Sequence, residues 1–381
     1  MGKLSRRQVL LGGGAIVGAG LVPAIPSTTA TPAFSLVNSA LAATNPTPEN
    51  PIRLSANENP YGPSRVALQA IAKNLHLANR YADGPIEAEL IDVVAKINNV
   101  PTDHMMVTTG SAEVLNVAGL LAGLRTGSVV CVDPTFQSLL RYAENAGMEI
   151  IRVPVNENLN ADLPAMRRAL RSDTAMVYIV NPNNPIPSII EKNAMREFVL
   201  EMSQSRLVFV DEAYHEFVEN PDYESMIGLI AEGHNNIIVS RTASKIHGLA
   251  GMRVGFGFAH PDLISEMKMR RTGDNNVIGM SAAVASYKDQ EFQDFTRRKN
   301  RQSLAIVENM CEELGIRYAK SNTNFTFIQT GVENRIVQEK MLRHGILTGR
   351  DFPPMTNWAR ISMSTPEHME YFVQAFRKEF A

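Results

Sequence analysis

Residues 237–257 read Ile-Ile-Val-Ser-Arg-Thr-Ala-Ser-Lys-Ile-His-Gly-Leu-Ala-Gly-Met-Arg-Val-Gly-Phe-Gly, an apolar run followed by a polar, glycine-rich stretch. The run Ile237–Val239 is short and continuously apolar, which is typical of a strand buried on both faces of a sheet. The stretch after it contains one lysine, Lys245, among small residues and glycines. An isolated lysine is usually a solvated surface residue. These neighbours instead favour a functional role for Lys245.

Similar apolar runs recur between residues 111 and 257. They are Val129–Val132, Met176–Val180, Leu207–Val210, Ile237–Val239 and Val254–Phe258. Segments with helical spacing lie between some of them, at Phe136–Ala146, Pro164–Leu170 and Glu191–Ser203. This alternation predicts an α/β fold with a mostly parallel central sheet flanked by helices.

The pattern changes after about residue 278. A long amphipathic helix is predicted at Gln290–Leu314, strands at Phe325–Gln329 and Arg360–Met363, and a last helix from Pro366. We therefore expect an N-terminal arm at 43–65, a large domain at 66–278 and a small C-terminal α+β domain at 279–381.

The first 42 residues have the order of a secretory signal. Arg6 and Arg7 precede an apolar run, Leu10–Val22, and Ala40-Leu41-Ala42 provides an A-x-A cleavage site. The paired arginines indicate a twin-arginine signal peptide over residues 1–42, hence a periplasmic or secreted protein, or a cytoplasmic one if the signal is unused. A stable membrane span is disfavoured because the run is shorter than the roughly 20 residues that cross a bilayer.

Composition excludes some classes of function. The 381-residue chain has a formal net charge of −2, which gives no sign of a nucleic-acid surface. Its two cysteines are too few for a disulfide framework, and Cys131, inside an apolar run, is predicted to be a buried, inert thiol.

Polar residues follow three of the predicted strands. They are Asn181–Pro185, Asp211–Tyr214 and Ser240–Lys245. Ligands of open α/β sheets bind at the carboxyl ends of the strands, so we expect these segments to meet at one edge. A lysine amine, an acid and anion donors are the groups that pyridoxal 5′-phosphate (PLP) needs. Asp211 would be costly to bury without a cation, and a protonated pyridine nitrogen is such a cation.

The motifs around these residues carry a specific resemblance. They are Leu54-Ser-Ala-Asn-Glu-Asn-Pro-Tyr-Gly-Pro63, Arg80-Tyr-Ala-Asp-Gly84, Thr109-Gly-Ser-Ala-Glu-Val114, Asp133-Pro-Thr-Phe136, Asn181-Pro-Asn-Asn-Pro185, Val210-Asp-Glu-Ala-Tyr214 and Arg241-Thr-Ala-Ser-Lys-Ile-His-Gly-Leu-Ala-Gly-Met-Arg253. The sequence resembles fold type I PLP enzymes of the aminotransferase class I/II group, and within it most closely the histidinol-phosphate aminotransferases.

The resemblance implies roles at the cofactor. Lys245 would hold PLP as a Schiff base and move the proton at the substrate, with Asp211 on the pyridine nitrogen and Tyr214 and Asn184 on the ring oxygen. Phe136 would stack on the ring, or else be a core aromatic. The predicted phosphate contacts, including the start of a helix, are Ser111, Ala112, Glu113, Thr242, Ser244 and Arg253.

The resemblance also implies a homodimer and a substrate pocket. Tyr81 would reach the phosphate in the neighbouring subunit's site. Arg360 would bind the substrate carboxylate, and Asn57 and Tyr61 would wall the pocket. Arg350 would either bind substrate or be a surface residue.

Two departures from the family pattern leave the chemistry open. Ile186-Pro187 replaces the Thr-Gly that is usual in the family. The stretch from Gly349 to Arg360 is shorter than the corresponding segment of typical histidinol-phosphate aminotransferases. We expect an aminotransferase acting between an L-amino acid, or a histidinol-phosphate-like amine, and a 2-oxo acid. The alternatives are a PLP-dependent decarboxylase or oxidase on the same scaffold and a non-catalytic exported binding protein.

Two further possibilities are disfavoured. No G-x-G-x-x-G motif follows a predicted strand and opens a helix, so a dinucleotide site is not expected. His215 and His247 lack metal-ligand spacing, and we predict that they pack or line the pocket, with no metal site.

Overall fold

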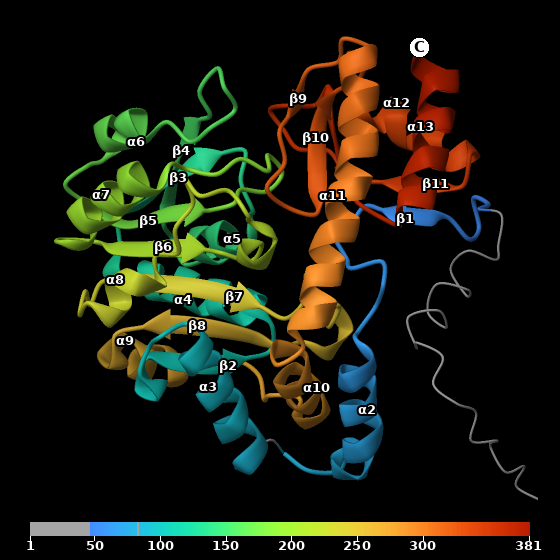
Figure 1. The fold of residues 1–381 in the computed structure, drawn as a ribbon. Coiled ribbons are helices and arrows are strands. Elements are labelled where there is room, and N and C mark those ends of the chain that lie inside the picture. Colours follow the sequence, from blue (N-terminus) through green and yellow to red (C-terminus); the bar gives the residue numbers. More distant parts are fainter. Residues whose placement is uncertain (1–45, 82–83) are drawn as a thin grey trace, which may run out of the picture.

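The computed structural model describes residues 46–81 and 84–381 (Figure 1). The predicted signal, residues 1–42, lies outside the described residues. Within them, a seven-stranded sheet has the order β2-β8-β7-β6-β5-β3-β4. Its strands are β2 (Met105–Thr108), β3 (Ser128–Asp133), β4 (Glu149–Pro154), β5 (Thr174–Val180), β6 (Leu207–Asp211), β7 (Ile237–Thr242) and β8 (Gly255–Ala259).

The sheet is mostly parallel, as predicted, but one strand is reversed. Neighbouring strands from β4 to β7 pair in parallel, whereas β8 runs antiparallel to both β7 and β2. The run Val254–Phe258 was predicted as a strand without its direction, and the structure shows that it is the reversed one. Between β7 and β8 the chain forms only the 3-10 turn η4 (Ala250–Met252) and has no helix to carry it back across the sheet. Glu149–Pro154, an edge strand with a mixed burial pattern, was not predicted.

Helices cover both faces of the sheet because its strands are apolar on both sides. One face packs on α4 (Ser111–Arg125), α5 (Ser138–Asn145) and α9 (Pro261–Lys268). The other face packs on α3 (Pro85–Ile97), α6 (Leu163–Ala169), α7 (Lys192–Ser203), α8 (Ile227–Ala231) and α10 (Val277–Tyr287). Neighbouring residues of one strand enter opposite cores. Cys131 is fully buried in the core formed with α4, α5 and α9, and burial raises the pKa of its thiol to about 12.

A second, smaller sheet lies in the C-terminal part. Its antiparallel order is β12 (Trp358–Ser362), β10 (Phe325–Gln329), β9 (Tyr318–Ala319). It packs with α11 (Gln290–Glu313), α12 (Asn334–Arg343) and α13 (Pro366–Phe380). The N-terminal β1 (Ile52–Leu54) pairs in parallel with β11 (Ile346–Thr348), and Figure 1 shows these two strands side by side. The arm is thus tied to the C-terminal part.

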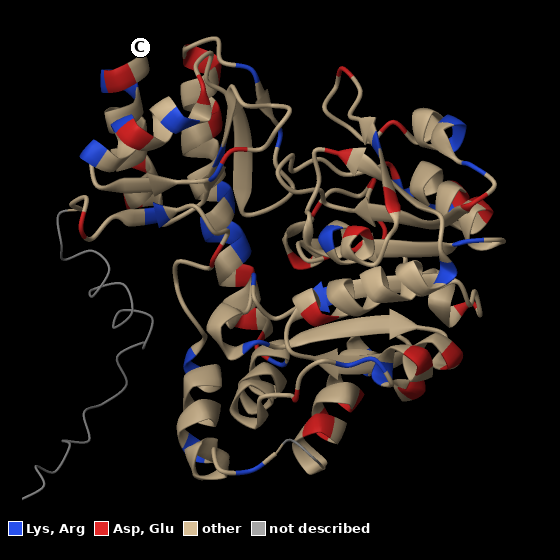
Figure 2. Ribbon diagram, turned by 180° about the vertical axis from the view of Figure 1, so that it is seen from behind, with Lys and Arg blue, Asp and Glu red and all other residues tan. Residues whose placement is uncertain are grey.

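The remaining helix, α2 (Arg65–Asn74), packs on α10, and short 3-10 turns occur at Leu75–Leu77, Thr102–His104 and His215–Phe217. Figure 2 shows acidic and basic residues interspersed over the molecule. Among the described helices, none is both long and apolar enough to cross a bilayer.

Candidate active site

A cavity of about 320 Å³ lies at the carboxyl ends of β5, β6 and β7. Most of the residues singled out in the sequence line it. The lining residues are Ala56, Asn57, Ser111, Ala112, Phe136, Val180, Asn184, Asp211, Ala213, Tyr214, Thr242, Ser244, Lys245, Ala250, Arg253, Arg350 and Arg360. The parallel pairing of β5, β6 and β7 brings their polar ends to the same place.

Lys245 follows β7 in a tight turn. Its carbonyl oxygen accepts a hydrogen bond from the N–H of Gly248, which has a φ of +66°. Its Nζ donates to the carbonyl oxygen of Asn57 at 3.3 Å and lies 5.4 Å from the centre of the Tyr214 ring. The amine therefore points into the cavity from β7 and is held by the N-terminal arm.

Asp211 ends β6, opposite Ser240 of β7. Its Oδ1 accepts hydrogen bonds from the Ser240 hydroxyl at 2.8 Å and from the N–H of Ala213 at 3.2 Å. Burial raises the pKa of Asp211 to about 6, although the Ser240 hydroxyl, the Ala213 N–H and the charge of Lys245 lower it. Among the described residues this carboxylate forms no ion pair. A cationic ring nitrogen would supply the missing charge, so Asp211 fits a PLP site.

Tyr214 lies at the centre of a hydrogen-bond network that reaches the far wall. Its hydroxyl oxygen accepts from Asn57 Nδ2 at 2.9 Å and from Asn184 Nδ2 at 3.2 Å. Arg360 Nη1 donates to Asn184 Oδ1 at 2.8 Å, while Arg360 Nε is buried without a partner among the described residues. Burial lowers the pKa of Arg360 to about 10, which leaves the guanidinium charged at neutral pH. This charge favours an anionic ligand.

The start of α4 forms an anion-binding corner with Arg253. Gly110, with a φ of +80°, precedes the helix, and a Cβ atom there would lie only 2.3 Å from Arg253 Nη2. Glycine thus lets this guanidinium lie against the helix start, where Ser111 and Ala112 line the cavity. The lining hydroxyls of Thr242 and Ser244 bond to each other at 2.9 Å. This corner fits the phosphate of PLP.

Three predicted site residues are not brought into this cavity. The N–H of Glu113 donates to the Gly110 carbonyl oxygen, and its carboxylate bonds Thr109 and Arg271 instead of facing the cavity. Tyr61 is buried elsewhere, with its ring edge-on to Phe295 at 4.9 Å. Tyr81 is 82% exposed.

Some contributors were missed in the sequence. Ser240 orients Asp211, and Ser362 holds Asn57 by accepting from its N–H at 2.9 Å. Ser240 could have been identified in the sequence, because it directly follows the predicted strand Ile237–Val239 just as Asp211 follows Leu207–Val210. Ser362 had no local signal, because its contact joins opposite ends of the chain.

The two histidines near the site pack against aromatic side chains. His247 stacks on Tyr287 at 3.9 Å and bonds the Ser286 hydroxyl, and burial lowers its pKa to about 3. His215 bonds the Tyr223 hydroxyl at 3.2 Å. The described part of the chain contains no cluster of three or more His, Cys, Asp or Glu side chains that could hold a metal ion.

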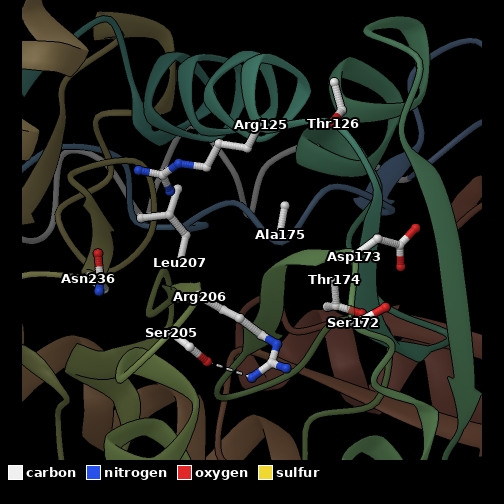
Figure 3. A pocket seen from close by; sticks show the side chains of 10 residues that line it. All are labelled: Arg125, Thr126, Ser172, Asp173, Thr174, Ala175, Ser205, Arg206, Leu207 and Asn236. Atoms are coloured by element: carbon white, nitrogen blue, oxygen red, sulfur yellow. Dashed lines mark hydrogen bonds between the residues drawn. The ribbon is translucent and has the colours of Figure 1, made fainter.

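Cavity size alone does not identify the site. A cavity of about 330 Å³ lies at the opposite edge of the sheet, near the starts of β5, β6 and β7, and is shown in Figure 3. Arg125 and Arg206 line it, and Arg206 Nη1 donates to the Ser205 hydroxyl at 2.8 Å. It contains no lysine, and its one acid is Asp173. Of these two cavities in the described part of the chain, the one with Lys245 and Asp211 has the groups for PLP chemistry.

The fold and the site define a fold type I PLP enzyme. Residues 49–376 match the model of the family described as aminotransferase class I and II. The chain is 32% identical over 333 residues to the histidinol-phosphate aminotransferase of Moorella thermoacetica, covering 87% of this chain and 86% of that one.

Two solved structures extend the likeness. A provisionally named histidinol-phosphate aminotransferase from Erwinia carotovora atroseptica SCRI1043 aligns with a TM-score of 0.83 at 34% identity, covering 88% of this chain and 97% of the other. Histidinol-phosphate aminotransferase from Sinorhizobium meliloti, solved with PLP, aligns with a TM-score of 0.78 at 23% identity, covering 95% and 99%. The chain belongs to the aminotransferase class I and II family. It is a PLP-dependent aminotransferase similar to histidinol-phosphate aminotransferases.

Proposed function

We propose that this enzyme moves an amino group between an L-amino acid, or a histidinol-phosphate-like amine, and a 2-oxo acid. The observation that carries the proposal is the placement of Lys245 and Asp211 in one cavity with the buried Arg360. When bound, PLP supplies a carbonyl carbon for the amino group and an electron sink next to the substrate Cα.

The residues of the chain then have distinct tasks. Lys245 Nζ would bind the cofactor carbonyl and would move the proton at the substrate Cα. Asp211 would balance the charge on the ring nitrogen. Tyr214 and Asn184 would bind the ring oxygen, and Arg360 would orient the substrate by its carboxylate. Phe136, which lines the cavity, would cover the ring.

The anion-binding corner would hold the cofactor by its phosphate. Ser111 and Ala112 offer the N–H groups at the start of α4, and Arg253 offers its guanidinium. The hydroxyls of Thr242 and Ser244 complete the corner.

The proposal is tested by supplying the PLP-loaded enzyme with a panel of L-amino acids, with and without 2-oxoglutarate. Turnover that requires the 2-oxo acid is the expected result. Release of carbon dioxide, or uptake of oxygen without an acceptor, would support a decarboxylase or an oxidase and would overturn the proposal. A protein that takes up no PLP would overturn it too.

We further infer that the enzyme works as a homodimer in which Tyr81 completes the neighbour's site. The exposure of Tyr81, which is not among the described residues lining the cavity of its own chain, supports this inference. Tyr81→Ala is expected to weaken turnover about tenfold, the effect of losing one hydrogen bond to a charged group.

Co-expression with Lys245→Ala tests whether Tyr81 acts across the interface. In a mixed dimer one site has both native residues, so the mixture should be more active per subunit than either variant alone. A mixture no more active than the average of the two variants would contradict the shared site.

We also propose that the enzyme is exported through the twin-arginine route. The support is Arg6 and Arg7, the apolar run after them and the Ala40-Leu41-Ala42 segment. Arg6→Lys with Arg7→Lys is expected to keep the enzyme, unprocessed, in the cytoplasm, since this route reads the paired arginines. Cell fractionation followed by N-terminal sequencing measures the outcome. Equal export of the native and the double-lysine chains would contradict the proposal.

A further inference from the structure

Two successive acids at the end of β6 make contacts on opposite sides of the chain. Asp211 lines the active-site cavity, and its Oδ1 accepts from the Ser240 hydroxyl of β7. Glu212, the next residue, bonds Arg241, the residue after Ser240. Neighbouring residues along a strand point to opposite faces. The ends of β6 and β7 are therefore joined by one polar pair on the cavity side and by a second pair behind it.

The second pair is an ion pair that is almost closed to water. The side chains of Glu212 and Arg241 are 1% and 5% exposed. Arg241 Nε donates to Glu212 Oε2 at 2.8 Å, and the N–H of Met226 donates to Glu212 Oε1 at 2.7 Å. The N–H of Glu212 donates to the Ser240 carbonyl oxygen at 3.0 Å. The main chain and the side chain of Glu212 thus both fix the residue next to Asp211.

Ser225 connects the two members of this ion pair. Its hydroxyl donates to Glu212 Oε2 at 2.7 Å and accepts from Arg241 Nη2 at 2.8 Å. A second acid lies near the same guanidinium, since Glu216 Oε1 is 4.0 Å from Arg241 Nη1. Glu216 Oε2 is buried without a hydrogen-bond partner among the described residues. The hydroxyl of Ser225 therefore favours pairing of Arg241 with Glu212 over pairing with Glu216.

The charge of Glu212 acts on Asp211. Burial is the main cause of the raised pKa of Asp211, and the charge of Glu212 adds to it. Arg241 balances that charge while it pairs with Glu212. If Arg241 turned to Glu216, Glu212 would become a buried, unpaired carboxylate one residue from Asp211. Such a charge favours the protonated form of its neighbour and is costly enough to shift the chain around it, and either change weakens a contact with a cationic ring nitrogen.

We propose that an ion pair and a hydroxyl behind the cavity position the Asp211 carboxylate for the pyridine nitrogen of PLP. The positioning residues are Glu212, Arg241 and Ser225, none of which is among the described residues that line the cavity. They act through Asp211, and Ser225 keeps Arg241 from Glu216. This assignment rests on the proposed function only in placing the ring nitrogen at Asp211.

The test exchanges the cofactor of the PLP-loaded full chain against an equal mixture of PLP and an analogue in which carbon replaces the ring nitrogen. Because the analogue cannot make the contact with Asp211, the ratio of the two bound compounds, measured by chromatography after release, reports that contact. Native enzyme should prefer PLP, and Asp211→Asn should lose the preference. Arg241→Met is expected to lower the preference about tenfold and Ser225→Ala about threefold, the range for weakening a hydrogen bond to a charged group.

Rescue separates positioning from simple structural support. Adding Glu216→Gln to Ser225→Ala removes the acid that competes for Arg241 and should restore the native preference. This pair of variants keeps the test valid if Arg241→Met fails to fold. Arg196→Met, which breaks the surface ion pair between α7 and Glu232, is the matched control and should keep the native preference. A purely structural role would lower the total amount of bound cofactor and leave the preference unchanged.

Three results would overturn the proposal: no preference for PLP in native enzyme, a native preference in both Arg241→Met and Ser225→Ala, or failure of Glu216→Gln to rescue. Failure of the proposed function would look different. Native enzyme would then show the preference for PLP and yet transfer no amino group from any L-amino acid to a 2-oxo acid.

Discussion

Replacing Lys245 by alanine is expected to abolish transamination and the visible absorbance of covalently bound PLP. Among the described residues that line the cavity, Lys245 supplies the only lysine amine, so we expect no other amine to bind the cofactor carbonyl or to move the substrate proton. Loss of a positioned acid–base group of this kind lowers turnover by about 10⁴-fold. Single-turnover absorbance and steady-state amino transfer measure the two effects.

The matched control is Lys268→Ala, at the exposed end of α9. It should keep native colour and activity. A Lys245→Ala protein that keeps both would disprove the assignment of this site. Loss of colour with turnover within tenfold of native would show that another group moves the proton.

Asp211→Asn is expected to lower turnover about 10²-fold to 10³-fold while stabilising the cofactor-free protein. The asparagine keeps the shape of the side chain but loses the charge that a cationic ring nitrogen needs. The estimate corresponds to the loss of one preorganised electrostatic contact in a water-excluded site. Asp211→Glu, which keeps the charge on a longer side chain, should retain more activity than Asp211→Asn.

The stability effect has a defined pH dependence. Burial raises the pKa of Asp211 from 3.8 to about 6, so the folded protein disfavours the ionised form. Below pH 3.8 the carboxyl is protonated in both the folded and unfolded states, and its ionisation costs no stability. The cost grows as the pH rises from 3.8 and is complete above about 6, where it amounts to about 3 kcal/mol.

Urea unfolding of the cofactor-free proteins measures this cost. The Asp211→Asn variant should exceed the native protein in free energy of unfolding at pH 8, and this advantage should shrink as the pH falls below about 6. An advantage that grows at low pH would contradict the assignment. The cofactor affinity of the native protein should exceed that of the variant most above pH 6, because there the carboxylate is charged.

Much of the fold followed from local patterns. The strands from β3 to β7 were predicted except for the edge strand β4, and α7, α11 and α13 begin within one residue of the predicted positions. The secondary structure of long, strongly apolar or strongly periodic segments can be predicted from the hydrophobic pattern of the segment itself. The direction of β8 cannot, because an apolar run is the same whichever way the strand runs.

Active-site residues that directly follow predicted strands were predicted well, and those in other parts of the chain were predicted less well. Asp211, Tyr214 and Lys245 share the cavity because parallel strands end at one edge. Glu113 was predicted to offer its N–H at the start of the helix, but in the structure that N–H donates to the Gly110 carbonyl oxygen and the carboxylate turns to Thr109 and Arg271. Tyr61 belongs to the same sequence motif as Asn57, but its ring packs on Phe295 and does not line the cavity.

By itself the sequence determined the class of fold, the cofactor chemistry and the residues at the strand ends, because hydrophobic periodicity and strand-end placement are local properties. Only the tertiary structure decided which distant groups meet. The carbonyl oxygen of Asn57 accepts from Lys245, and Asn334 of α12 holds the turn that carries Arg350. Those contacts depend on how the arm and the C-terminal part pack on the sheet, which no short stretch of residues encodes. The glycine-rich stretch at 237–257 thus predicts a PLP lysine, and the packing around it decides what that lysine can act on.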